Sequence, residues 1–164
     1  MTPATNEEAT AYHEAGHAIV GAIRGRSPES VTIVRQGGTA GQTQFFDDCR
    51  PEFNRYLGGS PEKRDYIETR ILIALAGTIA HDLRFPAHVR DSGDEYDEER
   101  ARALIVENAV WADSCRDSYF RQLQETVRGV LQTNWPWVEA VARALIDDKT
   151  ISGEELSRLR PSCD

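Results

Sequence analysis

The stretch from residue 60 to residue 79 constrains the fold more strongly than any other part of the sequence. It begins with Ser60-Pro61-Glu62-Lys63, and proline is well suited to the first position of a helix. Apolar residues then recur at every fourth position, namely Ile67, Ile71, Leu75 and Ile79. The central section of this stretch is apolar nearly all round. A helix that is apolar on every side must be surrounded by other elements. Because the apolar run is far shorter than the roughly 20 residues of a membrane-spanning helix, we expect a central, buried helix.

Helix and hairpin signals precede this stretch. Thr5-Asn6-Glu7-Glu8 has the form of a capping box, which predicts the start of a helix that ends near Gly25. Two short segments, 31–35 and 42–46, are suited to strands, and glycines lie between them at Gly37-Gly38. This arrangement predicts a small antiparallel hairpin.

Helical patterns also dominate the second half of the chain. We expect one helix from about Asp94 to Val110, a second carrying Tyr119 to Leu131, and a third after Pro136. Another capping-box pattern, Ser152-Gly153-Glu154-Glu155, predicts a short last helix. The sequence therefore predicts a single domain over residues 1–164, mainly α-helical with a small β-hairpin or sheet near its N-terminus, an α+β fold.

Composition excludes several classes of partner. The chain has 164 residues and a formal net charge of -8, whereas nucleic acids and anionic membranes require a basic face. We therefore expect neither partner.

The three cysteines form no C-x-x-C pair, which argues against a disulfide scaffold and favours a reducing compartment. The first ten residues have no basic or apolar leader pattern, so we expect a cytoplasmic protein.

The sequence His13-Glu14-Ala15-Gly16-His17 carries the clearest chemical signal. Residues four apart on a helix lie on the same face, so the two imidazoles can bind one zinc ion together. Glu14 is offset by about 100° around the helix and can act as general base toward a water on the metal. Gly16 has no side chain and therefore leaves space on the helix surface beside the metal. The alternative is that these are separately satisfied core histidines beside a surface glutamate.

A catalytic zinc site needs a third protein ligand, and spacing alone does not identify it. The candidates are His81, His88, Asp91, Asp94, Glu95 and Asp97. The acidic run that contains four of them has another explanation, because acidic residues in the first turn of a helix interact favourably with its dipole.

The segment Ala11 to Ala18 resembles the metal helix in the peptidase domain of the FtsH family, which are membrane-anchored AAA+ zinc proteases. Three further segments are similar to that domain: the hairpin residues 31–34 and 41–43, the Leu-Ala-Gly-rich helix at 73–80, and Gly93 to Ala101. The last of these resembles the family pattern Gly-Ala-x-Asn-Asp-Leu-x-x-Ala. The resemblance implies that Asp97 is the third zinc ligand.

The sequence also departs from that family. His81 stands where the family has a glutamate, and no G-x-x-x-x-G-K-[ST] phosphate loop occurs in the 164 residues. The resemblance implies a zinc metallopeptidase of the HExxH type, and because the phosphate loop is missing from these residues we expect cleavage of peptides or unfolded polypeptides without ATP. Two alternatives remain: a zinc-binding interaction or regulatory module without turnover, and a helical domain in which the motif is accidental. The oligomeric state is left open.

Overall fold

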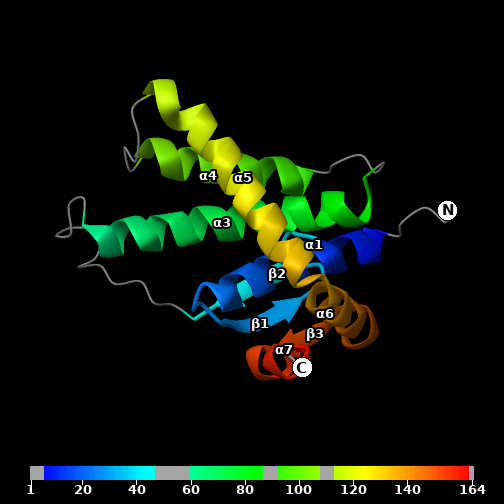
Figure 1. Ribbon diagram of the computed structural model, residues 1–164. Helices are drawn as coiled ribbons and strands as arrows, with labels where there is room; N and C mark the ends of the chain where they lie inside the picture. Colours follow the sequence, from blue (N-terminus) through cyan, green and yellow to red (C-terminus); the bar gives the residue numbers. More distant parts are fainter. Residues whose placement is uncertain (1–5, 47–59, 87–91, 108–112, 163–164) are drawn as a thin grey trace.

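Helices make up most of the computed structural model, which describes residues 6–46, 60–86, 92–107 and 113–162 (Figure 1). The elements in chain order are α1 (Asn6–Ile23), β1 (Pro28–Thr32), β2 (Gln42–Phe45), α3 (Pro61–Arg84), α4 (Ser92–Glu107), the 3-10 turn η1 (Asp113–Cys115), α5 (Arg116–Thr133), α6 (Trp135–Asp148), β3 (Thr150–Ser152) and α7 (Gly153–Arg158). The predicted fold class, mainly α with a small sheet near the N-terminus, is confirmed.

Helix α3 is the central element, as the sequence predicts. The Ser60 hydroxyl accepts a hydrogen bond from the Lys63 N–H at 3.2 Å, and Pro61 occupies the first turn. Ile71 and Ala76 are fully buried, and α3 packs against α1, α4 and α5 (Figure 1). Within the described ranges, no helix is both long enough and apolar enough to cross a membrane.

Helices α1 and α3 approach each other closely at Gly16. A Cβ added to Gly16 would lie 2.4 Å from the Ala76 carbonyl oxygen and 2.7 Å from the Ala80 Cβ. A side chain at this position would therefore push the two helices apart. The glycine of the His-Glu-Ala-Gly-His sequence thus faces α3, and its small size brings the two histidines of α1 next to that helix.

The sheet has three strands in the order β2-β1-β3, so β2 lies at an edge. Strand β1 is antiparallel to both neighbours, with Val31 opposite Thr43 on one side and Ile151 on the other. The expected hairpin is present, but the predicted first strand, 31–35, is wrong in its bounds. Strand β1 begins at Pro28 and ends at Thr32, and beyond it the Val34 N–H donates to the Thr32 hydroxyl at 3.1 Å instead of to a neighbouring strand.

The turn between the first two strands uses both predicted glycines. Gly37 and Gly38 have φ values of 55° and 97°, a left-handed conformation that residues with a side chain rarely adopt. Gln36 and Thr39 flank them as a two-residue bridge. The sheet strand that the sequence pattern does not predict is β3, which has three residues and therefore too little length for a periodic signal.

The C-terminal elements cover β1 from the side opposite β2. The predicted capping box opens α7: the Ser152 hydroxyl accepts from the Glu155 N–H, and the Glu155 carboxylate accepts from the Ser152 N–H at 2.7 Å. The Trp137 indole N–H donates to the Leu156 carbonyl at 3.0 Å, which joins α6 to α7. Thr5 and Val110, which the sequence analysis placed at helix ends, lie outside the described residues.

Candidate metal centre

Helix α1 places two imidazole rings next to each other on one face. His13 and His17 lie one turn apart, with their ring centroids 4.7 Å apart and their planes at 80°. Their Nε2 atoms are 3.0 Å apart. The side chains are 16% and 12% exposed, so both rings are largely shielded from bulk water while the pair remains accessible. The expected same-face arrangement of the two histidines is therefore present.

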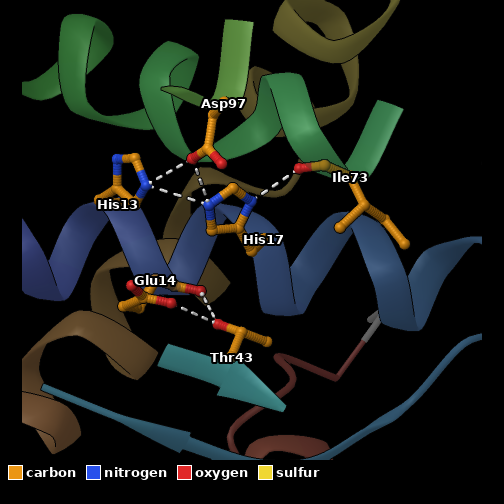
Figure 2. Close-up of polar contacts among 6 residues, drawn as sticks. All are labelled: His13, Glu14, His17, Thr43, Ile73 and Asp97. Carbon is orange, nitrogen blue, oxygen red and sulfur yellow. Dashed lines mark hydrogen bonds and ion pairs between the residues drawn. The ribbon is translucent and has the colours of Figure 1, made fainter. Parts of the chain in front are cut away.

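A carboxylate from a distant part of the chain meets these rings. Asp97 on α4 places its Oδ2 atom 2.9 Å from His13 Nε2 and 3.0 Å from His17 Nε2. Figure 2 shows the three side chains converging between α1 and α4. Among the residues that the structure describes, these three make up the one group of His, Cys, Asp or Glu side chains arranged to hold a metal ion.

Helix α3 determines which nitrogen of His17 carries the proton. His17 Nδ1 lies 2.7 Å from the Ile73 carbonyl oxygen. A carbonyl oxygen can only accept, so Nδ1 must donate its proton. In the neutral ring the proton is then on Nδ1, and Nε2 keeps the lone pair that a metal requires. The contact therefore leaves His17 Nε2 in the form that metal binding requires.

Asp97 is held in its ionised form. Burial by itself raises the pKa of this carboxyl group, but hydrogen bonds and charge interactions with His13 and His17 outweigh burial and bring its pKa well below the ordinary value. Asp97 Oδ2 is therefore an acceptor at neutral pH. Two imidazole nitrogens and one ionised carboxylate oxygen meet at this point, which is a donor set that cations bind.

The space beside these atoms is kept open by Gly77 of α3. A Cβ added there would lie 2.4 Å from His17 Nε2 and 2.6 Å from His13 Nε2, closer than real carbon atoms come. Two imidazole nitrogens and one carboxylate oxygen suit zinc. Both the donor set and the space at Gly77 therefore fit a zinc ion.

Glu14 points in a different direction from its two histidine neighbours. Figure 2 shows its side chain on the face of α1 that is turned toward β2. Its Oε2 atom accepts a hydrogen bond from the Thr43 hydroxyl at 2.7 Å, and the residue is only 6% exposed. The structure thus does not bring Glu14 into the group formed by His13, His17 and Asp97, in keeping with the offset around the helix expected from the sequence.

The other candidates for the third ligand do not join the group or lie outside the described residues. His81 is buried on α3, where its ring packs against Phe85 with centroids 5.7 Å apart, and Glu95 is exposed. His88 and Asp91 lie outside the described residues, as does the side chain of Asp94.

The sequence analysis did not identify two residues that the structure places at this site, Gly77 and Thr43. Both lie within segments that resemble the FtsH family, but a glycine in an apolar helix and a threonine in a short strand carry no chemical signal. Their contacts with α1 depend on tertiary packing.

Comparisons with known proteins agree with the geometry. The model of Peptidase family M41 matches residues 1–111. An ATP-dependent zinc metalloprotease FtsH 2 from Salinibacter ruber is 38% identical over 96 residues, which cover 57% of this chain and 13% of that protein. An ATP-dependent zinc metalloprotease FtsH from Acidobacterium capsulatum is 33% identical over 109 residues, which cover 63% of this chain and 16% of that protein. Another from Acidimicrobium ferrooxidans is 26% identical over 190 residues, which cover 93% of this chain and 28% of that protein. The chain thus matches less than a third of the length of each relative.

Proposed function

The chain belongs to peptidase family M41, and on this premise we propose that it is a zinc metallopeptidase that hydrolyses peptide bonds in peptides or unfolded polypeptides. The observation that carries this proposal is the meeting of His13 Nε2, His17 Nε2 and Asp97 Oδ2 within 3.0 Å of one another. The FtsH relatives are named zinc metalloproteases, and these names support the same metal and the same reaction here.

We assign His13, His17 and Asp97 as the zinc ligands. Catalytic zinc sites commonly use three protein ligands and keep a further position for water or substrate. Zinc held by these residues would supply Lewis acidity, which makes water a stronger nucleophile and polarises the peptide carbonyl. The Nδ1 contact of His17 with Ile73 keeps the coordinating lone pair in place.

We assign Glu14 as the general base. It follows His13 directly in the chain, and its carboxylate is buried beside β2. In this role Glu14 removes a proton from the attacking water and delivers it to the amide nitrogen as the carbon–nitrogen bond breaks. A residue that only filled space at this position would not need to be a carboxylate.

The edge strand offers a way to hold an extended substrate. Strand β2 is the outer strand of the sheet, and sheet edges carry backbone groups that can pair with an added strand. Since β2 also contacts Glu14 through Thr43, a peptide added along β2 would lie near the proposed base. The alternative is an ordinary structural hairpin.

Unfolded or flexible chains are the substrates that we propose. The 164 residues contain no phosphate-binding loop of the G-x-x-x-x-G-K-[ST] type. We propose that the cleavage step itself requires no ATP, because it needs only water, a metal ion and a base, and that substrates must already be extended when they reach the site.

A second candidate function is a zinc-binding interaction or regulatory module without turnover. In this candidate the 2.7 Å hydrogen bond from the Thr43 hydroxyl to Glu14 Oε2 serves to attach α1 to β2 and has no part in turnover. Both candidates bind zinc, so turnover is what distinguishes them.

The experiment that tests the proposal measures cleavage of a fluorescently labelled, unfolded polypeptide by the zinc-loaded protein. Glu14→Gln is measured in parallel, with zinc content determined for both proteins. We expect wild-type cleavage without ATP and loss of cleavage in Glu14→Gln at unchanged zinc content. Glu29→Gln serves as the matched control, because Glu29 is exposed on β1, and it should cleave as the wild type does. Full zinc content without cleavage of a broad peptide set would instead favour the module without turnover.

A further inference from the structure

Thr43 makes two contacts with a single residue of α1. Its hydroxyl oxygen lies 2.7 Å from Glu14 Oε2 and 3.2 Å from the Glu14 carbonyl oxygen. A hydroxyl has one proton to donate, and the 2.7 Å contact with the carboxylate oxygen lies within the usual range for O–H···O hydrogen bonds, whereas the 3.2 Å contact lies beyond it. The principal contact is therefore with the carboxylate.

The Glu14 side chain is also confined on its other side. A Cβ added to Gly41 would lie 2.8 Å from Glu14 Cγ and 2.9 Å from Glu14 Oε1. Gly41 therefore allows the backbone before β2 to lie directly against the glutamate. With Thr43 at one carboxylate oxygen and Gly41 beside the other, little room remains for a different rotamer.

The strand that carries Thr43 is itself fixed in place. Thr43 lies opposite Val31 of β1, which is fully buried. Two residues further along β2, Phe45 reaches α1 at Gly21, where an added Cβ would lie 2.4 Å from the Phe45 ring. Because side chains two apart on a strand point to the same face, Thr43 and Phe45 both point at α1. The Thr43 hydroxyl thus approaches Glu14 from a strand that is paired with β1 along one edge and packed against α1 on one face.

We infer that Thr43 is the positioning residue of the general base: its hydroxyl holds Glu14 Oε2, so that the carboxylate keeps one orientation on the face of α1 that is turned toward β2. This inference rests on the proposed function. Thr43 does not itself contact the reacting atoms. Its contribution is to reduce the number of orientations that Glu14 samples, and reactions are sensitive to such misplacement.

The test compares Thr43→Val, which keeps the shape and removes the hydroxyl, with Thr43→Ser, which keeps the hydroxyl. We expect Thr43→Val to lower kcat about 10- to 100-fold, with KM and zinc content unchanged. Thr43→Ser should recover most of the wild-type kcat. Thr126→Val is the matched control, because Thr126 is exposed on α5 and bonds only to the Gln122 carbonyl of its own helix among the contacts described. Its kcat should equal that of the wild type.

A purely structural role would give a different pattern. Thr43→Val would then lower the melting temperature or the zinc content, and the protein that remained folded and zinc-loaded would turn over normally. Equal kcat for zinc-loaded Thr43→Val and wild type would overturn the inference.

Crystal structures of the zinc-loaded wild type, Thr43→Val and Thr43→Ser supply a readout independent of turnover. We expect one Glu14 conformer in the wild type and in Thr43→Ser, and several in Thr43→Val. If the wild type shows no cleavage, the proposed function fails, and these structures still decide whether Thr43 orients Glu14. An unchanged Glu14 conformer in Thr43→Val would overturn the inference whatever the activity.

Discussion

Gly77 on α3 lies so close to His17 on α1 that a Cβ at residue 77 would come within 2.4 Å of the His17 Nε2 atom. The absence of a side chain at residue 77 therefore keeps the coordinating face of the imidazole open. His13 Nε2 depends on the same space, at 2.6 Å from the added Cβ. Figure 2 shows where this face lies, between α1 and the helices above it.

Gly77→Ala is expected to lower zinc affinity by more than about tenfold, because misoriented ligands lose affinity on this scale. The metal-free protein should remain folded, since alanine is favoured over glycine in a helix by about 1 kcal/mol. Zinc affinity is measured by competition with a chromophoric chelator. Gly129→Ala is the control, because an added Cβ there meets nothing within 4 Å, and it should bind zinc as the wild type does. Wild-type affinity in Gly77→Ala would show that the ligand atoms do not converge beside Gly77.

Gly41→Ala is expected to affect turnover and not metal binding. The added Cβ would lie 2.9 Å from Glu14 Oε1, so the carboxylate must move, whereas the three ligand atoms lie elsewhere. Zinc titration and peptide cleavage are measured on the same sample. We expect normal zinc affinity with a kcat that falls about 10- to 100-fold. Reduced zinc affinity in Gly41→Ala would contradict the separation between the base and the ligands.

Asp97→Ala is expected to weaken zinc binding by more than about 100-fold, since losing a ligand costs more than losing a residue that merely orients one. Its carboxylate is the one that meets both histidines. Glu95→Ala removes an exposed carboxylate two residues away on α4 and should leave the affinity unchanged. Isothermal titration with zinc compares the two variants. If Asp97→Ala kept full affinity, Asp97 would not be a zinc ligand.

Glu155 is expected to contribute stability that depends on pH. Hydrogen bonds from the Ser152 backbone and side chain lower the pKa of Glu155 from its ordinary value of 4.5. A lowered pKa in the folded state means that the stabilisation is present above pH 4.5 and is lost as the pH falls through the folded-state pKa. Urea unfolding at about pH 7 and at about pH 3 should therefore show Glu155→Gln less stable than the wild type at the higher pH, with the difference reduced at the lower pH. An equal difference at both pH values would contradict a stabilising contribution from the ionised Glu155 carboxylate.

Local patterns in the sequence were sufficient to predict most of the helices. The capping residues Ser60 and Ser152, the four-residue spacing in α3 and the placement of His13 and His17 on one face all involve residues a few positions apart. Helix geometry determines how such residues face one another. These features were therefore predictable without knowledge of the rest of the fold.

Contacts between distant segments could not be predicted in this way. Asp97 and His13 are 84 residues apart, and among the acidic residues near α4 the sequence alone offered no reason to choose Asp97. That choice came from the resemblance to a family. Strand β3 pairs with β1 across more than a hundred residues, and its three residues carry no periodic signal.

What the sequence determined by itself is the amphipathic helix that presents two histidines, because that property depends only on the spacing along one helix. What only the tertiary structure decided is the environment of those histidines. Asp97 completes the group, Gly77 leaves room beside it, and Thr43 holds Glu14 on the face of α1 that is turned toward β2. Each of these relationships depends on how α3, α4 and β2 pack against α1, and packing is a property of the whole fold.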